Sequence, residues 1–351
     1  MEKSISGNME KVSFKNDYSE GCHPMILEKI VQSNMEQEDG YGADRHSMEA
    51  RTIISEKTGV AAEQIYFIPV GTQTNLLALS AILKPYEYVI AAESGHIVYV
   101  EAGAIEATGH KIIHLATQAD GKVRVVDLDV FFEKMADIHN ELIPRVLYVS
   151  NTTEMGGVYS KQELVQLSQY CKQKDLLLYM DGARLASALA ASDVTFKDLA
   201  ALTDAFYIGA TKAGGMMGEA LVLVNPKLNK GFSIVQKQKG ATLAKGRFLG
   251  IQFAELLRGD LYIDLARHAN MMALKMANAI REAGFDFLAA PQSNQLFPIL
   301  PNTIIAQLVE KYSFYEWRKV DAGFTAIRLI TSWATKEENV DAFVHDFQFL
   351  T

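Results

Sequence analysis

Short apolar runs rich in β-branched and aromatic residues alternate with segments of helical periodicity through the first two thirds of the 351-residue chain. The runs that predict strands are 65–70, 88–92, 111–114, 146–150, 176–180, 205–209 and 220–224. The intervening segments that predict helices are 72–83, 97–107, 126–138, 161–174 and 196–202. The runs are continuously apolar rather than alternating, which is typical of strands buried on both faces. We therefore expect an α/β fold with a mostly parallel sheet sandwiched between helices.

The pattern changes after Pro226, where longer helical stretches take over. The segments expected there are helices at 250–257, 261–283 and 303–312, an apolar segment at 295–299 and a strand at 325–331. They predict a smaller C-terminal α+β domain. We expect an N-terminal arm (1–20), a large domain (21–250) and a small domain (251–351).

Composition and charge narrow the possible partners. The chain has 34 Lys and Arg against 42 Asp and Glu, a net charge of −8, so it offers no basic surface for nucleic acid. Two cysteines, Cys22 and Cys171, are too few for a disulfide framework or a structural zinc cluster, and no metal site is assigned. No signal-peptide pattern or membrane-length apolar run occurs, so we expect a soluble, cytoplasmic protein without a membrane contact.

Lys212 is the most informative single residue. It follows the apolar run 205–209 and precedes three glycines within the next six residues, a setting with room for a flat ring. A lysine held partly out of water has a lowered pKa and can form a Schiff base. The alternative is an ordinary loop lysine.

Three further polar positions follow predicted strands, so they share the edge of the sheet where such folds bind ligands. Asp181 could hold the pyridine nitrogen of pyridoxal phosphate protonated, or could cap the next helix. Gly71 and Thr72 open a helix whose free N–H groups suit a phosphate monoester, or form a plain helix cap. His96 could stack on a cofactor ring, or could be structural. No dinucleotide or P-loop motif occurs.

Taken together, these motifs resemble a known family from about residue 14 to the C-terminus. They include Asn-Asp-Tyr at 16–18, Asp-Gly-Tyr-Gly-Ala-Asp at 39–44, Gly-His-Ile at 95–97, Glu-Ala-Gly at 101–103, Gly-Gly-Val at 156–158, Asp-Gly-Ala-Arg-Leu at 181–185, Gly-Ala-Thr-Lys at 209–212, Lys-Gly-Arg-Phe at 245–248 and Ile-Arg-Leu-Ile-Thr at 327–331. Their order resembles that of the threonine aldolase and β-eliminating lyase group of fold-type I pyridoxal-phosphate enzymes, which are built like aspartate aminotransferase.

The resemblance implies a role for each matching residue. Lys212 would carry pyridoxal 5′-phosphate as a Schiff base, Asp181 would contact the pyridine nitrogen, and His96 would stack on the ring. The full cofactor-binding set implied is Gly71, Thr72, Gln73, His96, Asp181, Arg184 and Lys212. The substrate-binding set implied is Asn16, Tyr41, Thr153, Arg184 and Arg328.

Two of these assignments carry further expectations. The guanidinium groups of Arg184 and Arg328 would bind the substrate carboxylate, the alternative being ordinary surface or ion-paired arginines. In the family, Tyr41 and either Lys245 or Arg247 would approach the site from a neighbouring subunit. A homodimer or homotetramer is therefore expected.

The chain departs from the family after the strand 146–150. Many threonine aldolases have Asn-Thr-His there, with the histidine near the substrate hydroxyl, whereas this chain reads Asn-Thr-Thr-Glu at 151–154. It therefore resembles a divergent branch. The candidates for the base at the hydroxyl are His96, Thr153 through a water, and Glu154, in that order.

The activity we expect is cleavage of a β-hydroxy-α-amino acid, L-threonine or L-allo-threonine, to glycine and an aldehyde. The first alternative is β-elimination, which uses the same cofactor apparatus. A second alternative is a cofactor-binding protein without turnover. The complete set of Lys, Asp, His and Arg residues argues against the second.

Overall fold

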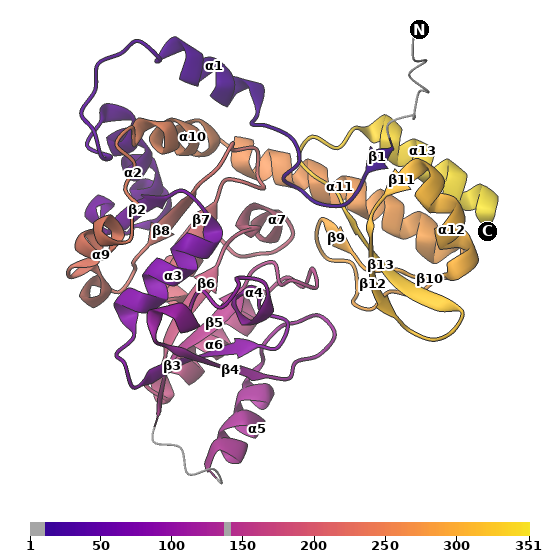
Figure 1. Ribbon diagram of the computed structural model, residues 1–351, viewed down its shortest axis with the longest axis horizontal. Helices are drawn as coiled ribbons and strands as arrows, with labels where there is room; N and C mark the ends of the chain where they lie inside the picture. Colours follow the sequence, from indigo (N-terminus) through magenta and orange to yellow (C-terminus); the bar gives the residue numbers. More distant parts are fainter. Residues whose placement is uncertain (1–10, 137–141) are drawn as a thin grey trace, which may run out of the picture.

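One seven-stranded sheet forms the centre of the larger part of the molecule (Figure 1). The computed structural model describes residues 11–136 and 142–351. The strands, in sheet order, are β2 (Ile65–Ile68), β8 (Glu219–Val222), β7 (Ala205–Gly209), β6 (Leu177–Asp181), β5 (Ile143–Ser150), β3 (Glu87–Ala92) and β4 (Lys111–Leu115). Only β8 runs antiparallel to its neighbours. The expected mostly parallel sheet is confirmed.

Both faces of this sheet are buried, as the continuous apolar runs require. Along β5, Leu147 belongs to one apolar core, and Val146 and Tyr148 belong to the other. The helices of this part are α1 (Pro24–Gln32), α2 (Arg45–Thr58), α3 (Gly71–Ile82), α4 (His96–Tyr99), α5 (Val125–Ala136), α6 (Lys161–Gln173), α7 (Leu185–Ala190), α8 (Phe196–Leu202), α9 (Phe232–Gln238) and α10 (Arg247–Leu257).

Two predicted helices differ from those observed. The helix expected over 97–107 is wrong beyond its first turn, because α4 ends at Tyr99 and the backbone turns at Ala102 (φ 53°) and Gly103 (φ 71°). The helix expected over 126–138 corresponds to α5, which ends at Ala136; the last two predicted positions lie outside the described residues.

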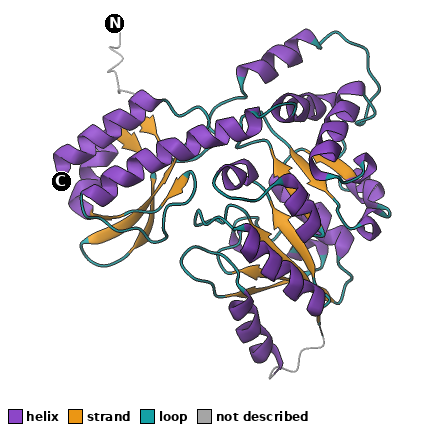
Figure 2. Cartoon of the chain, turned by 180° about the vertical axis from the view of Figure 1, so that it is seen from behind, coloured by secondary structure: helices purple, strands orange, loops and turns teal. Residues whose placement is uncertain are grey.

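The smaller part holds an antiparallel sheet against three helices (Figure 2). Its elements are α11 (Leu261–Glu282), β9 (Gln295–Leu296), β10 (Ile299–Pro301), α12 (Asn302–Lys311), β11 (Tyr312–Ser313), β12 (Tyr315–Lys319), β13 (Phe324–Ile330) and α13 (Glu337–Leu350). β13 lies between β10 and β12 and also pairs with β9. The expected α+β architecture is confirmed.

The N-terminal segment joins this smaller part. β1 (Val12–Ser13) pairs in parallel with β11, and Phe14 is buried among its apolar residues. Residues 1–10 of the predicted arm lie outside the described residues.

Helix α11 runs from one part of the molecule to the other (Figure 1). It contributes Tyr262 and Ala266 to a core of the large sheet, and Met272 and Met276 to the core of the smaller part. The predicted domain limit at residue 250 lies inside α10. The limits of the three predicted segments stay a prediction. Within 11–136 and 142–351, no helix has the length and hydropathy needed to cross a membrane.

Candidate active site

A cavity of about 200 Å³ opens where the parallel strands of the large sheet end. Gly71 follows β2, His96 follows β3, Asp181 ends β6 and Lys212 follows β7. All four lie on the cavity wall. The fold therefore brings together the residues that sequence reasoning placed at one sheet edge.

Asp181 lies on the cavity wall and is 4% exposed. Its Oδ2 accepts hydrogen bonds from Tyr148 (2.6 Å) and from Asn75 Nδ2 (3.0 Å). Its Oδ1 accepts from the Tyr207 hydroxyl and from the backbone N–H of Ala183 (2.9 Å). Four donors thus hold a buried carboxylate that has no cation within ion-pair distance among the residues described.

The residue after Asp181 has to be glycine. A Cβ on Gly182 would overlap the carbonyl oxygen of Tyr207 on the neighbouring strand. The Gly182 carbonyl also accepts hydrogen bonds from Gly209 and Leu185. Close contact with the neighbouring strand therefore explains the glycine of the Asp-Gly-Ala-Arg motif.

A polar chain joins His96 to this carboxylate. His96 Nδ1 lies 2.8 Å from Glu101 Oε1, and Glu101 Oε1 accepts from Asn75 Nδ2 at 2.8 Å. Asn75 also donates to Asp181, and Tyr179 donates to Asn75 Oδ1 at 3.0 Å. The Glu101 side chain is fully buried, whereas that of His96 is 40% exposed. The His96 tautomer that carries its proton on Nδ1 donates to Glu101 and leaves Nε2 as the free acceptor.

The amine of Lys212 is buried near several charges. Burial lowers the pKa of Lys212, and the Arg184 guanidinium acts in the same direction. Three carboxylates oppose this shift without cancelling it: Asp17, Asp181 and Glu219. A lowered pKa makes the neutral, nucleophilic amine more accessible near neutral pH.

The amino terminus of α3 faces the same cavity. Gly71 and Thr72 lie on its wall, and the N-cap residue Val70 provides no side-chain cap. Free N–H groups at a helix start attract anions, as expected for the phosphate position. The side chain of Gln73 points elsewhere and donates to the Lys239 carbonyl at 3.3 Å.

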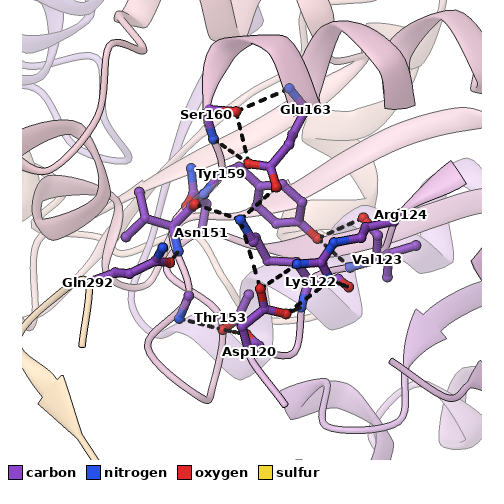
Figure 3. A network of polar contacts seen from close by, with 12 residues as sticks. Asp120, Lys122, Val123, Arg124, Asn151, Thr153, Tyr159, Ser160, Glu163 and Gln292 are labelled. Carbon is purple, nitrogen blue, oxygen red and sulfur yellow. Dashed lines mark hydrogen bonds and ion pairs between the residues drawn. The ribbon is translucent and has the colours of Figure 1, made fainter. Parts of the chain in front are cut away.

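The loop after β5 places Glu154, rather than Thr153, on the cavity wall. The Thr153 hydroxyl donates to the Asp120 carbonyl (2.6 Å) within the polar network of Figure 3, where Lys122 also bonds Glu163 at 2.6 Å. Thr153 is 1% exposed. Its hydroxyl is therefore occupied away from the cavity.

Glu154 is partly buried and accepts two hydrogen bonds. Its Oε1 accepts from Ser150 Oγ at 2.7 Å and from the backbone N–H of His96 at 2.8 Å. Burial raises the pKa of Glu154, and the Asp181 charge adds to this effect. The side chain therefore retains its proton to a higher pH than an exposed glutamate does.

Arg184 lies on the cavity wall, paired with an internal carboxylate. Its Nε and Nη2 donate to Asp17 Oδ2 (2.7 Å) and Oδ1 (2.9 Å), and Asn294 also donates to Asp17 at 2.9 Å. Burial opposes ionisation of Asp17, but Arg184 and Lys212 outweigh burial, and the pKa of Asp17 is lowered. Arg184 is thus fixed by a bidentate pair before any substrate binds.

Arg328 lies on β13 of the smaller part, with its guanidinium over two aromatic rings. The guanidinium carbon is 5.2 Å from the ring centre of Tyr315 and 5.0 Å from that of Trp317. Arg328 Nε is buried without a partner in the described part of the chain. Asn16, which was also assigned to substrate binding, makes local hydrogen bonds. Its Oδ1 accepts from the Tyr18 N–H and the Ser19 hydroxyl.

Three residues assigned to a neighbouring subunit do not line this cavity. Tyr41 is 59% exposed, and Lys237 Nζ lies 3.8 Å from its ring centre. Arg247 donates to the carbonyls of Glu36 and Asn34, and Lys245 is exposed. Within one chain, these residues are separate from the site.

Sequence reasoning missed several residues of the site. Tyr148 and Tyr207 lie within apolar strands and look like core positions, while Asn75 lies one helical turn after Gly71. Glu219, the first residue of β8, is an acidic residue directly before an apolar run. An acidic residue at the start of a buried strand was a usable signal for a site residue.

Comparison with known proteins places the fold and then the family. The fold is that of fold-type I pyridoxal-phosphate enzymes: aspartate aminotransferase from Thermus thermophilus matches with a TM-score of 0.69 at 14% identity, over 97% of this chain and 92% of that one. The family model for "Beta-eliminating lyase" matches residues 14–337, and the chain belongs to that family. The family resemblance read from the motifs is confirmed.

Two threonine aldolases are similar over nearly the whole chain. The "Low specificity L-threonine aldolase" of Pseudomonas aeruginosa is 30% identical over 346 residues, covering 96% of this chain and 97% of its own length. The structure described as Leishmania major threonine aldolase matches with a TM-score of 0.93 at 45% identity, over 97% of this chain and 99% of that one.

The buried pair of Asp17 and Arg184 generates a stability prediction. Replacing Asp17→Asn should lower the free energy of unfolding by about 3–5 kcal/mol at neutral pH, because Arg184 then remains buried without its counter-charge. The pKa of Asp17 is lowered in the folded protein, so its contribution is complete above the ordinary value of 3.8. The contribution is lost as the pH falls through the folded pKa.

Urea unfolding at neutral and acidic pH measures this effect. The exposed Asp39→Asn variant, which makes the same chemical change, should unfold like the wild type. Equal stability of Asp17→Asn and wild type at neutral pH would contradict the assigned role of the pair.

Proposed function

We propose that this protein is a pyridoxal-phosphate-dependent aldolase that cleaves L-threonine or L-allo-threonine to glycine and an aldehyde. The observation that carries the proposal is the convergence of Lys212, Asp181 and the α3 terminus on one cavity. The names of the Pseudomonas and Leishmania relatives support the reaction. The Listeria monocytogenes structure described as a putative L-allo-threonine aldolase supports the fold alone, at 17% identity and a TM-score of 0.74.

The residues present fit this cofactor. Lys212 offers an amine of lowered pKa, α3 offers N–H groups for a phosphate, and Asp181 offers a carboxylate for a ring nitrogen. When bound, pyridoxal phosphate withdraws electrons from the substrate's α carbon, which allows a bond to that carbon to break. Lys212 would hold the cofactor covalently, and Asp181 would keep a proton on the ring nitrogen.

Arg328 and Arg184 would hold the substrate carboxylate. Arg328 has an unpartnered Nε, and two aromatic rings fix the plane of its guanidinium. Arg184 has its Nη1 left over, because Asp17 takes the other two donor positions. We therefore propose that Arg328 makes the main contact with the substrate carboxylate and that Arg184 orients this carboxylate.

His96 is the preferred base for the substrate's β-hydroxyl proton. Its Nδ1 is occupied by Glu101, and its exposed Nε2 is the free acceptor. Glu154 is a weaker candidate, because its raised pKa favours the neutral acid. Thr153 is last, because its hydroxyl already donates to Asp120.

Covalent labelling combined with product analysis tests the function. The protein loaded with pyridoxal phosphate and reduced with borohydride should carry the label on Lys212 in peptide mapping. Lys212→Ala should carry none, and Lys336→Ala, which removes an exposed lysine, should label like the wild type. A label on another lysine would contradict the assignment.

Products from L-threonine, L-allo-threonine and L-serine then separate the two reactions. We expect glycine and an aldehyde, and Lys212→Ala should be slower by at least two powers of ten. Formation of a 2-oxo acid and ammonia without glycine would favour β-elimination instead. Absence of both would favour binding without turnover.

We also propose that the protein is a homodimer or homotetramer whose site is completed across an interface. The apolar side chains of Met25, Leu27, Val31 and Met35, in and just after α1, are at least half exposed in one chain. Sedimentation should therefore give at least twice the mass of one chain. A fully active monomer would contradict this proposal.

The cytoplasmic location expected from the sequence stays a prediction.

A further inference from the structure

Glu219 is a buried acid on the cavity wall to which no role has yet been given. It pairs with Gly209 on β7 and with Ile68 on β2, so its carboxyl group lies between the Lys212 loop and the start of α3. Its Oε1 is 3.8 Å from the position that a Cβ on Gly71 would take. Its Oε2 is 2.9 Å from the corresponding position on Gly209. Gly209 thus leaves the space that this carboxyl group needs, whereas the distance to Gly71 is an ordinary contact.

The hydrogen bonding of this carboxyl group is incomplete. Glu219 is 4% exposed, and its Oε1 accepts one bond from Thr211 Oγ1 at 3.3 Å. Its Oε2 is buried and has no partner in residues 11–136 and 142–351. An unpaired buried carboxyl oxygen is costly, so a group bound in the cavity is the natural partner.

The surroundings decide the charge of Glu219. Burial raises its pKa, the Lys212 amine opposes this, and Asp181 adds to the rise; the resulting pKa is well above the ordinary value. The Glu219 charge would in turn help burial to raise the pKa values of three nearby tyrosines, Tyr179, Tyr207 and Tyr262. A phosphate at α3 would add negative charge nearby and favour the neutral acid further.

We propose that Glu219, as a neutral carboxylic acid, donates a hydrogen bond from its carboxyl group to a phosphate oxygen held at the amino terminus of α3. The inference rests on the proposed function, since this phosphate is that of pyridoxal phosphate. The α3 N–H groups and Glu219 then bind the same anion from two sides. Loss of the Glu219 proton would replace a hydrogen bond by repulsion between two anions, so phosphate binding weakens as the pH rises.

Calorimetric titration of the cofactor-free, full-length protein with inorganic phosphate tests the inference. Titrations in two buffers of different ionisation enthalpy give the number of protons taken up on binding. In alkaline buffer, where Glu219 of the free protein is ionised, the wild type should take up more protons than Glu219→Gln, which keeps an N–H donor but cannot ionise. The Gln variant should also keep its affinity at alkaline pH, where that of the wild type falls.

Glu219→Ala shows whether Glu219 acts on phosphate as a hydrogen-bond donor or as a repelling negative charge. It removes the donor, so phosphate should bind about tenfold or more weakly at neutral pH. The control is Glu87→Gln, which changes an acid that is 7% exposed at the opposite end of the sheet, and it should bind phosphate like the wild type.

Three results would overturn the proposal. They are unchanged or tighter phosphate binding by Glu219→Ala, equal proton uptake by wild type and Glu219→Gln in alkaline buffer, and no phosphate binding by the wild type. Glu219→Gln preserves the side-chain volume, so it gives a result even where the Ala variant does not fold.

Borohydride labelling of Lys212 is independent of these titrations. A persisting label with any of the three results rejects the role of Glu219 alone, whereas loss of the label rejects the proposed function.

Discussion

The hydrogen bonds to Asp181 are the interaction on which the rest of the site depends. An ionised carboxylate out of water is tolerated only when charged or polar partners compensate for the lost hydration. Here the partners come from three separate elements: Tyr148 from β5, Tyr207 from β7 and Asn75 from α3. One side chain thus connects both neighbouring strands of β6 with α3. The same Asn75 amide carries the connection onward to Glu101 and His96.

A second constraint is the balance of charge around the cavity. Arg184 lies close enough to Lys212 to lower the pKa of Lys212, and Asp17 compensates by pairing with Arg184. Because Asn294 of the smaller part also holds Asp17, the charge balance connects the two parts of the molecule. The carboxylate of a substrate would enter a site whose nearest arginine is already oriented. This arrangement favours recognition by geometry over simple charge attraction.

The site residues that could be predicted from the strand pattern, before the family resemblance added others, lie at the ends of strands. Gly71, His96, Asp181 and Lys212 could be predicted because a parallel sheet collects its strand ends at one edge, and continuous apolar runs mark those strands. Arg184 was also predicted to be near the site, but its partner Asp17 is distant in sequence, so no local pattern reveals the pair. Helix α2 was missed because polar positions interrupt its apolar periodicity, whereas α1 has a clear amphipathic pattern that was a usable signal.

Other residues could not be predicted because a side chain's direction depends on tertiary contacts. Thr153 and Glu154 are adjacent, yet the Asp120 carbonyl takes the hydroxyl of Thr153, and Glu154 reaches the cavity. Tyr148 and Tyr207 have the apolar neighbours of ordinary core residues, and only the strand register brings their hydroxyls to Asp181.

The most direct test of this account is the protonation state of the cofactor's ring nitrogen. A ¹⁵N NMR spectrum of the protein loaded with ring-¹⁵N pyridoxal phosphate reports it without any turnover. We expect a protonated nitrogen in the wild type and an unprotonated nitrogen in Asp181→Asn, which has nearly the same shape but no charge. An unprotonated nitrogen in the wild type, or the same signal in both proteins, would contradict the assignment of Asp181 and the site built around it.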